Sequence, residues 1–139
     1  MEIQTDNPES GYTFPCYSFD NVDCIVLNTA YIMTCEASST LQYILGILNS
    51  HLGKFLVKLF VSQLQTRQFR MLAQFVSNFP IPLANEKFAI PIIHLVDTII
   101  KGKKSDIDFD TLNLEAQIDA LVYRLYGLTD KEIGFIESL

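Results

Sequence analysis

Apolar residues recur at intervals of three and four positions in three separate stretches of the chain, which is the spacing of one face of a helix. These stretches lie at about residues 40–61, 91–100 and 114–125. A helix with one apolar face must bury that face against another element, so the spacing predicts at least three helices packed together. A chain of 139 residues, 49% of them hydrophobic, has enough apolar side chains to do this within one compact domain.

Local capping signals predict where these helices begin and end. Residues 38–40 (Ser-Ser-Thr) are N-cap candidates for the first helix, and Pro91 suits the first turn of the second. The Lys-Gly-Lys-Lys run at residues 101–104 is expected to close the second helix, and Gly127 to stop the third. Thr129 and Glu132 have the spacing of a capping box, which predicts a short last helix.

The remaining segments contain the candidate strands. Residues 1–20 are polar and contain Pro and Gly, so we expect irregular structure there, whereas residues 24–34 are rich in β-branched and aromatic side chains and predict one or two strands. Residues 62–68 predict a polar break. Residues 69–79 resemble a further strand, which the prolines of the Phe-Pro-Ile-Pro run at 79–82 would end.

Together these patterns predict the α+β class. We expect a small mixed sheet with one packed helix, at about residues 40–61, followed by a C-terminal helical segment. The corresponding division places a recognition-type region at residues 1–86 and a helical region at residues 87–139.

Charged residues are distributed unevenly along the chain. Residues 1–53 contain six acidic and no basic residues, residues 54–104 contain eight basic and two acidic ones, and residues 105–139 contain eight acidic and two basic ones. The net charge of -6 argues against non-specific binding of nucleic acid by the chain as a whole, but its centre is locally positive.

The basic centre supplies the candidate binding residues. Lysine and arginine neutralise phosphates, and arginine or glutamine can bind two atoms of a guanine or adenine edge. We predict phosphate contacts from Lys54 and Lys58, which lie four residues apart on one helical face. Base or backbone contacts are predicted from Gln63, Gln65, Thr66, Arg67, Gln68 and Arg70. A solvated helix face followed by a turn would explain the same residues without any ligand.

Motifs of catalysis and metal binding are scarce. The sequence has no Gly-rich phosphate loop and no G-x-S-x-G motif, and its three cysteines and two histidines lack metal-ligand spacing. We therefore expect no catalytic residue and no metal in this chain. His51 is expected on the surface of the first helix, and His94 in the core or at its edge. The cysteine count and the absence of a signal peptide predict a cytoplasmic protein, and residues 41–61 are too polar to span a membrane.

Several short runs occur in the order found in the target-recognition domains of restriction–modification systems, which this chain resembles. They are LGILNS at residues 45–50, FPIP at 79–82, LVDTII at 95–100 and IDALVYRLYGLT at 118–129. The last run is similar to the family's ID-x-LVY-x-LYGLT-x-EI ending. The resemblance covers about residues 25–137 and points to TaqI-like C-terminal specificity domains of adenine-N6 DNA methyltransferases, including type IIG restriction enzymes and phage-defence methylases.

The resemblance implies a bacterial or archaeal protein that recognises DNA for a catalytic domain located elsewhere. That domain would bind S-adenosylmethionine and carry an Asn-Pro-Pro-Tyr motif, which residues 7–10 (Asn-Pro-Glu-Ser) do not match, so no cofactor is expected in this chain. The implied partners are double-stranded DNA and the methyltransferase domain of the parent. Two alternatives stay open: residues 106–139 dock on a partner subunit or on the parent's own catalytic domain without touching DNA, or the protein is an enzyme whose complete active site lies outside this chain.

The family's motif residues are assigned to structure rather than to base contacts. Residues 48–50 would serve helix packing and turn formation, residues 79–82 would end a strand, and residues 118–129 would form a helix pair that braces the domain.

Overall fold

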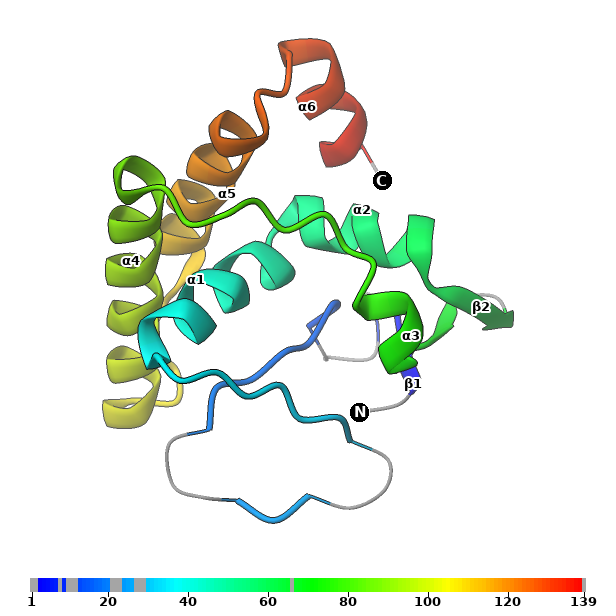
Figure 1. The fold of residues 1–139 in the computed structure, drawn as a ribbon, viewed down its shortest axis with the longest axis horizontal. Coiled ribbons are helices and arrows are strands. Elements are labelled where there is room, and N and C mark those ends of the chain that lie inside the picture. Colours follow the sequence, from blue (N-terminus) through cyan, green and yellow to red (C-terminus); the bar gives the residue numbers. More distant parts are fainter. Residues whose placement is uncertain are drawn as a thin grey trace.

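The computed structural model describes residues 3–7, 9, 13–20, 24–26, 30–65 and 67–138. Helices α1, α4 and α5 pack together at one side of the molecule, and α2 leads from them to a small sheet at the other side (Figure 1). The elements are β1 (Ile3–Thr5), α1 (Ser38–Asn49), α2 (His51–Phe60), β2 (Ser62–Gln65), β3 (Gln68–Arg70), α3 (Ala73–Val76), α4 (Glu86–Ser105), α5 (Leu112–Tyr126) and α6 (Asp130–Glu137). The predicted α+β class is confirmed.

The helix expected at about residues 40–61 is two helices separated at Ser50. Ser50 has extended backbone angles (φ -70°, ψ 167°), and its hydroxyl donates to the carbonyl oxygen of Ile47 at 2.6 Å and accepts from the Gly53 N–H at 3.1 Å. The same side chain therefore bonds the end of α1 and the beginning of α2. The prediction of one continuous helix was wrong, because the apolar spacing continues across Ser50. The family motif, by contrast, predicts a turn at residues 48–50.

The sheet is antiparallel and has the strand order β1-β3-β2. Arg70 of β3 lies opposite Ile3 of β1 and Ser62 of β2, so β3 is the central strand. Two predictions were wrong here. Residues 1–20, expected to be irregular, contain β1, and the polar break at residues 62–68 is a hairpin whose two strands are β2 and the start of β3.

Two further strand predictions were wrong. Only residues 69 and 70 of the stretch 69–79 are extended in the sheet, because α3 follows at Ala73. The described residues of the stretch 24–34 form no regular secondary structure, and residues 27–29 lie outside the described part. Strand propensity depends on packing against a neighbouring strand. Here Ile25 and Ile32 are 97% and 64% exposed, so that packing is missing in the described structure.

Helix α4 is longer than predicted at both ends. It begins after Asn85, whose side chain accepts from the Lys87 N–H at 3.0 Å, so Pro91 lies in its second turn rather than its first. The helix also continues through Gly102 to Ser105, because that glycine packs directly against the ring of Phe109 and does not end the helix. By contrast, the left-handed Gly127 (φ 66°) after α5 and the capping box of α6 are confirmed.

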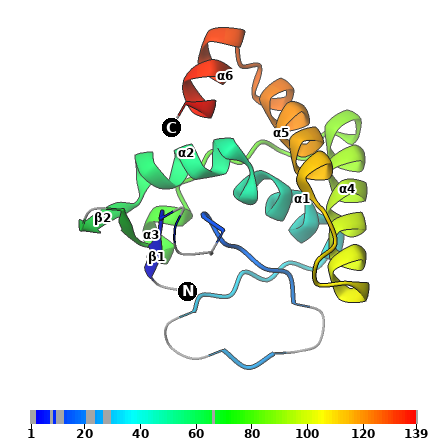
Figure 2. The same ribbon diagram turned by 180° about the vertical axis from the view of Figure 1, so that it is seen from behind.

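The hydrophobic core joins helices from both halves of the chain. Ile47, Val57, Ile92 and Val122 are completely buried, and they come from α1, α2, α4 and α5 respectively. Seen from behind, α4 and α5 again lie side by side against α1 (Figure 2). A Cβ atom at Gly46 of α1 would lie 2.6 Å from Cγ2 of Ile92, so the glycine permits close contact of α1 with α4. The predicted division of the chain into a recognition-type region and a helical region at residue 86 stays a prediction.

Candidate nucleic-acid interface

The two lysines predicted to bind phosphate converge on one carboxylate of the same chain. On α2, Lys54 and Lys58 are one turn apart, and their Nζ atoms lie 3.3 Å from Oδ1 and 3.1 Å from Oδ2 of Asp6. The three side chains are between 16% and 27% exposed, so water still reaches them. The structure thus brings the predicted lysines together, around an acidic partner that follows β1.

The hairpin that joins β2 to β3 lies beside this group. The backbone N–H of Asp6 donates to the carbonyl oxygen of Arg67 at 2.8 Å. Arg67 is exposed at the turn and has a left-handed backbone (φ 64°), an uncommon conformation for a residue other than glycine. Its predicted neighbour Thr66 lies outside the described residues. Asp6 therefore connects the two lysines of α2 to the tip of the hairpin.

The predicted glutamines and Arg70 are divided between the two faces of the sheet. Side chains alternate along a strand, so Gln68 and Arg70 share one face of β3, on which Arg70 is exposed and Gln68 is half-buried. Phe69 points to the other face and is buried. Gln63, which is exposed, lies opposite Phe69 in the register and therefore on that other face. The side chain of Gln65 is outside the described part of the structure.

Polar and aromatic contacts support the face of the sheet that carries Phe69. The side chain of Gln4 in β1 donates to the carbonyl oxygen of Cys16 at 3.1 Å and accepts from its N–H at 2.8 Å. The ring of Phe14 packs against that of Phe69 at a centroid distance of 5.3 Å. This face is consequently covered by residues 14–16, and the opposite face is the one that presents Arg70.

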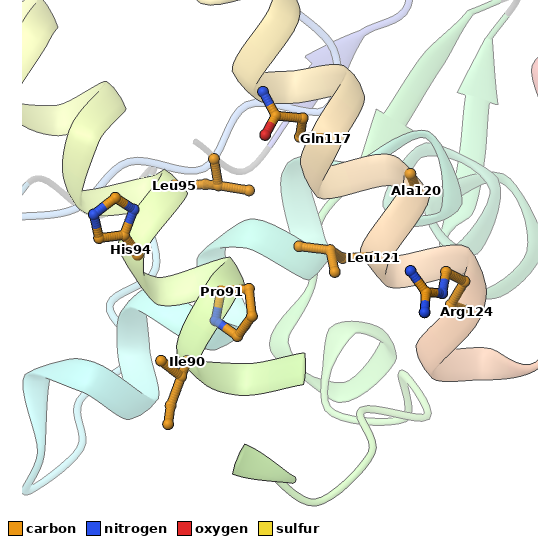
Figure 3. Close-up of a pocket in the computed structure, with 8 residues that line it drawn as sticks. All are labelled: Ile90, Pro91, His94, Leu95, Gln117, Ala120, Leu121 and Arg124. Atoms are coloured by element: carbon orange, nitrogen blue, oxygen red, sulfur yellow. The ribbon is translucent and has the colours of Figure 1, made fainter. Parts of the chain in front are cut away.

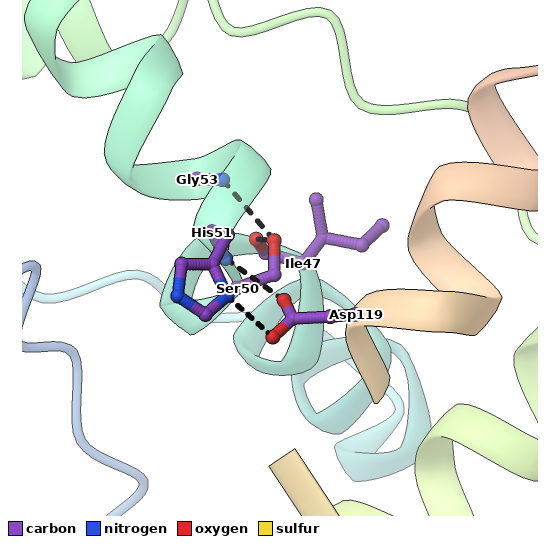
Figure 4. A network of polar contacts seen from close by, with 5 residues as sticks. All are labelled: Ile47, Ser50, His51, Gly53 and Asp119. Atoms are coloured by element: carbon purple, nitrogen blue, oxygen red, sulfur yellow. Dashed lines mark hydrogen bonds and ion pairs between the residues drawn. The ribbon is translucent and has the colours of Figure 1, made fainter. Parts of the chain in front are cut away.

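A second polar group joins the residue that follows the LGILNS run to the C-terminal motif at residues 118–129 (Figure 4). Asp119 of α5 accepts from the His51 backbone N–H at 2.8 Å and lies 2.6 Å from Nδ1 of the same residue. Its carboxylate is nearly buried at the N-terminus of α2, where a negative charge is favourable. The side chain of Asn49 donates to the carbonyl oxygen of Tyr17 at 2.9 Å and accepts from its N–H at 3.0 Å. His51 is exposed, as predicted, but it begins α2 rather than lying within a longer helix.

Two tyrosines hold the FPIP segment. The hydroxyl of Tyr126 donates to the carbonyl oxygen of Pro80 at 2.9 Å, and that of Tyr43 donates to the carbonyl oxygen of Pro82 at 3.2 Å. Burial raises the pKa of Tyr126 to about 12, so its hydroxyl remains a donor even at a pH at which an exposed tyrosine ionises. The expectation that residues 79–82 end a strand was wrong, because α3 lies between them and β3. These contacts were missed because helical spacing does not reveal where a buried hydroxyl points.

A groove lies between α4 and α5, away from the basic hairpin (Figure 3). Its volume is about 590 Å³, and its apolar residues are bordered by the polar side chains of His94, Gln117 and Arg124. His94 is exposed there, at an edge of the packed helices. Among the described residues no cluster of His, Cys, Asp and Glu could hold a metal ion. None of the helices in the described part of the chain has both the length and the apolarity needed to cross a membrane.

The TaqI-like C-terminal specificity domain family matches residues 11–81, a range that includes α1, α2 and the β2–β3 hairpin. The chain belongs to this family. No curated protein and no solved structure matches it. Membership identifies a specificity domain of restriction–modification enzymes and indicates that this chain selects a target rather than catalyses a reaction.

Proposed function

We propose that this chain recognises the DNA site of an adenine-N6 DNA methyltransferase in the cytoplasm of a bacterium or archaeon. The observation that carries the proposal is the exposed Arg67 at the tip of the β2–β3 hairpin, next to two lysines of α2. A two-stranded ribbon fits into the major groove, where arginine binds guanine O6 and N7 with two hydrogen bonds. The lysines beside the hairpin would then contact the phosphates that border the groove.

The division of labour within the parent enzyme follows from this assignment. A methyltransferase domain, fused to an endonuclease in a type IIG parent, would bind S-adenosylmethionine, and that cofactor supplies the methyl group. An adenine within a duplex must be rotated out of the stack before its N6 atom can be reached, which requires a protein surface that holds the surrounding DNA in register. In this proposal, Arg67 and Arg70 determine the sequence that is held, while Lys54 and Lys58 fix its position.

The test replaces Arg67 and Arg70 by alanine in the full-length parent enzyme and measures site-specific methylation. Each substitution is expected to weaken recognition by about 1–3 kcal/mol, or roughly five- to 150-fold in kcat/KM, if the side chain binds a base. Lys131→Ala is the control, because Lys131 is an exposed basic residue of α6 that belongs neither to the hairpin nor to the lining of the α4–α5 groove. Unchanged methylation by the Arg67→Ala/Arg70→Ala enzyme would exclude both arginines from recognition.

The α4–α5 groove supports a second candidate, docking of this chain on its methyltransferase domain or another protein without DNA contact. Ile90 at the groove is 61% exposed, and an exposed apolar group beside a concave surface is typical of an interface. Ile90→Asp should then reduce binding to a separately produced methyltransferase domain by more than tenfold. Leu83→Asp is the control, since Leu83 is 94% exposed and does not line the groove. Equal binding by both variants would argue against docking at this groove.

A further inference from the structure

Asp6 brings a carboxylate between two lysines of the same helix. Lys54 and Lys58 are like charges four residues apart on one helix, an arrangement that is unfavourable unless an anion lies between them. Each oxygen of the Asp6 carboxylate takes one of the lysines. The lysines therefore hold an anionic group with two oxygens, one at each ammonium group.

A DNA phosphate offers these lysines the same chemistry as the carboxylate. A phosphodiester carries a single negative charge, shared by two non-bridging oxygens, and lysine binds it as a point charge. We propose that Asp6 occupies the phosphate site formed by Lys54 and Lys58, and that a bound duplex displaces its carboxylate. Asp6 is then an internal competitor that weakens binding of the DNA backbone; this inference rests on the proposed function.

The surroundings of Asp6 suit a group that is displaced without unfolding the domain. Its ion pairs with the lysines are partly exposed to water, and ion pairs of this kind contribute little to stability. Its backbone is held separately, by the N–H bond to Arg67 and by the three-residue strand β1 that precedes it. The backbone therefore keeps the carboxylate at a high effective concentration near the lysines, while the carboxylate itself can move away.

The arrangement favours specific over non-specific binding. Phosphates are present along any duplex, so lysines without a competitor would bind DNA of any sequence. With Asp6 in place, the phosphate contribution is reduced for every sequence. A site that also satisfies Arg67 and Arg70 has base contacts that compensate for displacing the carboxylate.

The experiment uses the full chain and a fluorescent duplex of arbitrary sequence, about 25 base pairs long, with affinities measured at several NaCl concentrations. Asp6→Asn should bind roughly three- to tenfold more tightly than the wild type at low salt, because two partly exposed ion pairs no longer compete. The slope of log affinity against log salt should steepen by up to about 1. Asp97→Asn is the matched control: it removes the same charge, from the pair with Lys101 on α4, and should give less than a twofold change.

A double-mutant cycle locates the effect. Lys54→Gln/Lys58→Gln should bind the duplex more weakly than the wild type, and adding Asp6→Asn to it should produce no gain. Asp6→Ser, checked for native circular dichroism, repeats the test if the asparagine variant does not fold. If Asp6→Asn and Asp6→Ser bind no more tightly than Asp97→Asn while the lysine variant is weakened, Asp6 is not a competitor and the phosphate assignment survives. If the lysine variant binds as the wild type does, the phosphate assignment fails, and the inference about Asp6 with it.

Discussion

Replacing Asp119 by alanine should destabilise the protein more than its single carboxylate suggests. Asp119 of α5 is 8% exposed and accepts two hydrogen bonds from His51, one from the backbone N–H and one from the ring. The substitution removes the contact between α5 and the beginning of α2, and it leaves that N–H of α2 without its carboxylate acceptor.

The magnitude follows from these contacts. A hydrogen bond to a charged group contributes about 1.5–3 kcal/mol, and a negative charge at a helix N-terminus adds about 0.3–1 kcal/mol. The His51 ring is more than half exposed, so its bond is discounted for screening by water. The expected loss in the free energy of unfolding for Asp119→Ala is therefore about 2–3 kcal/mol. Asp119→Asn keeps an oxygen for the His51 N–H but loses the charge, and should cost about half as much.

Urea unfolding followed by circular dichroism at neutral pH measures this loss. With an m-value of about 2 kcal/mol per molar urea, Asp119→Ala should lower the midpoint by about 1–1.5 M. Asp97→Asn is the control, because Asp97 forms an exposed pair with Lys101 within α4 and should change stability by less than about 0.5 kcal/mol. If the two variants unfold at the same urea concentration, the contact between α5 and α2 does not stabilise the fold and the argument fails.

Two pairs of matched substitutions give further predictions. Gly46→Ala should destabilise the protein by about 1–3 kcal/mol, because its methyl group would press against α4. Gly134→Ala in α6 has open space at its Cβ and should stabilise the protein by about 0.5–1 kcal/mol. Equal thermal midpoints for the two variants would contradict this packing. Tyr126→Phe should lower the free energy of unfolding by about 1 kcal/mol, because it removes the hydrogen bond to Pro80. Tyr123→Phe should be neutral or stabilising, because the buried Tyr123 hydroxyl has no hydrogen-bond partner among the described residues. Urea midpoints shifted in the same direction would refute this contrast. Burial also raises the pKa of Tyr123 to about 12, so the unfolded state loses this proton at lower pH than the folded state does. The free energy of unfolding should therefore fall as the pH rises from about 10 to 12, and it should fall less steeply in Tyr123→Phe. An identical fall in both proteins would argue against this effect of Tyr123.

Sequence alone predicted the features that depend on neighbouring residues. The left-handed Gly127 and the capping box at Thr129 and Glu132 occur where expected, because each signal is completed within a few residues. The helical stripes were also found, since buried positions on one helix repeat at a fixed interval. The boundaries were less accurate: Pro91 was placed at a helix start, although Asn85 caps the helix six residues earlier.

Features that depend on distant residues were not predicted. The apolar spacing within residues 38–61 does not reveal that Ser50 separates two helices, and the contact of Asp119 with the beginning of α2 comes from 68 residues further along the chain. Similarly, the basic centre was identified from composition, but its acidic partner Asp6 comes from a segment expected to be irregular. Charge counts along a sequence describe which groups are available. They do not describe which of these groups are brought within an ion-pair distance by the fold.

The contact of Tyr126 with Pro80 and that of Asp119 with His51 each join α5 to the range matched by the family. In a chimaeric enzyme that received only residues 11–81 from this protein, the recipient's own C-terminal helices would have to supply the acceptor for His51, the donor for Pro80 and the apolar surface against which α1 packs. Exchanging specificity between relatives should therefore succeed when the recipient's C-terminal helices carry these side chains, and otherwise require the donor's helices to be transplanted with its hairpin. A new target would then be acquired by a hairpin together with helices that fit it, rather than by the hairpin alone.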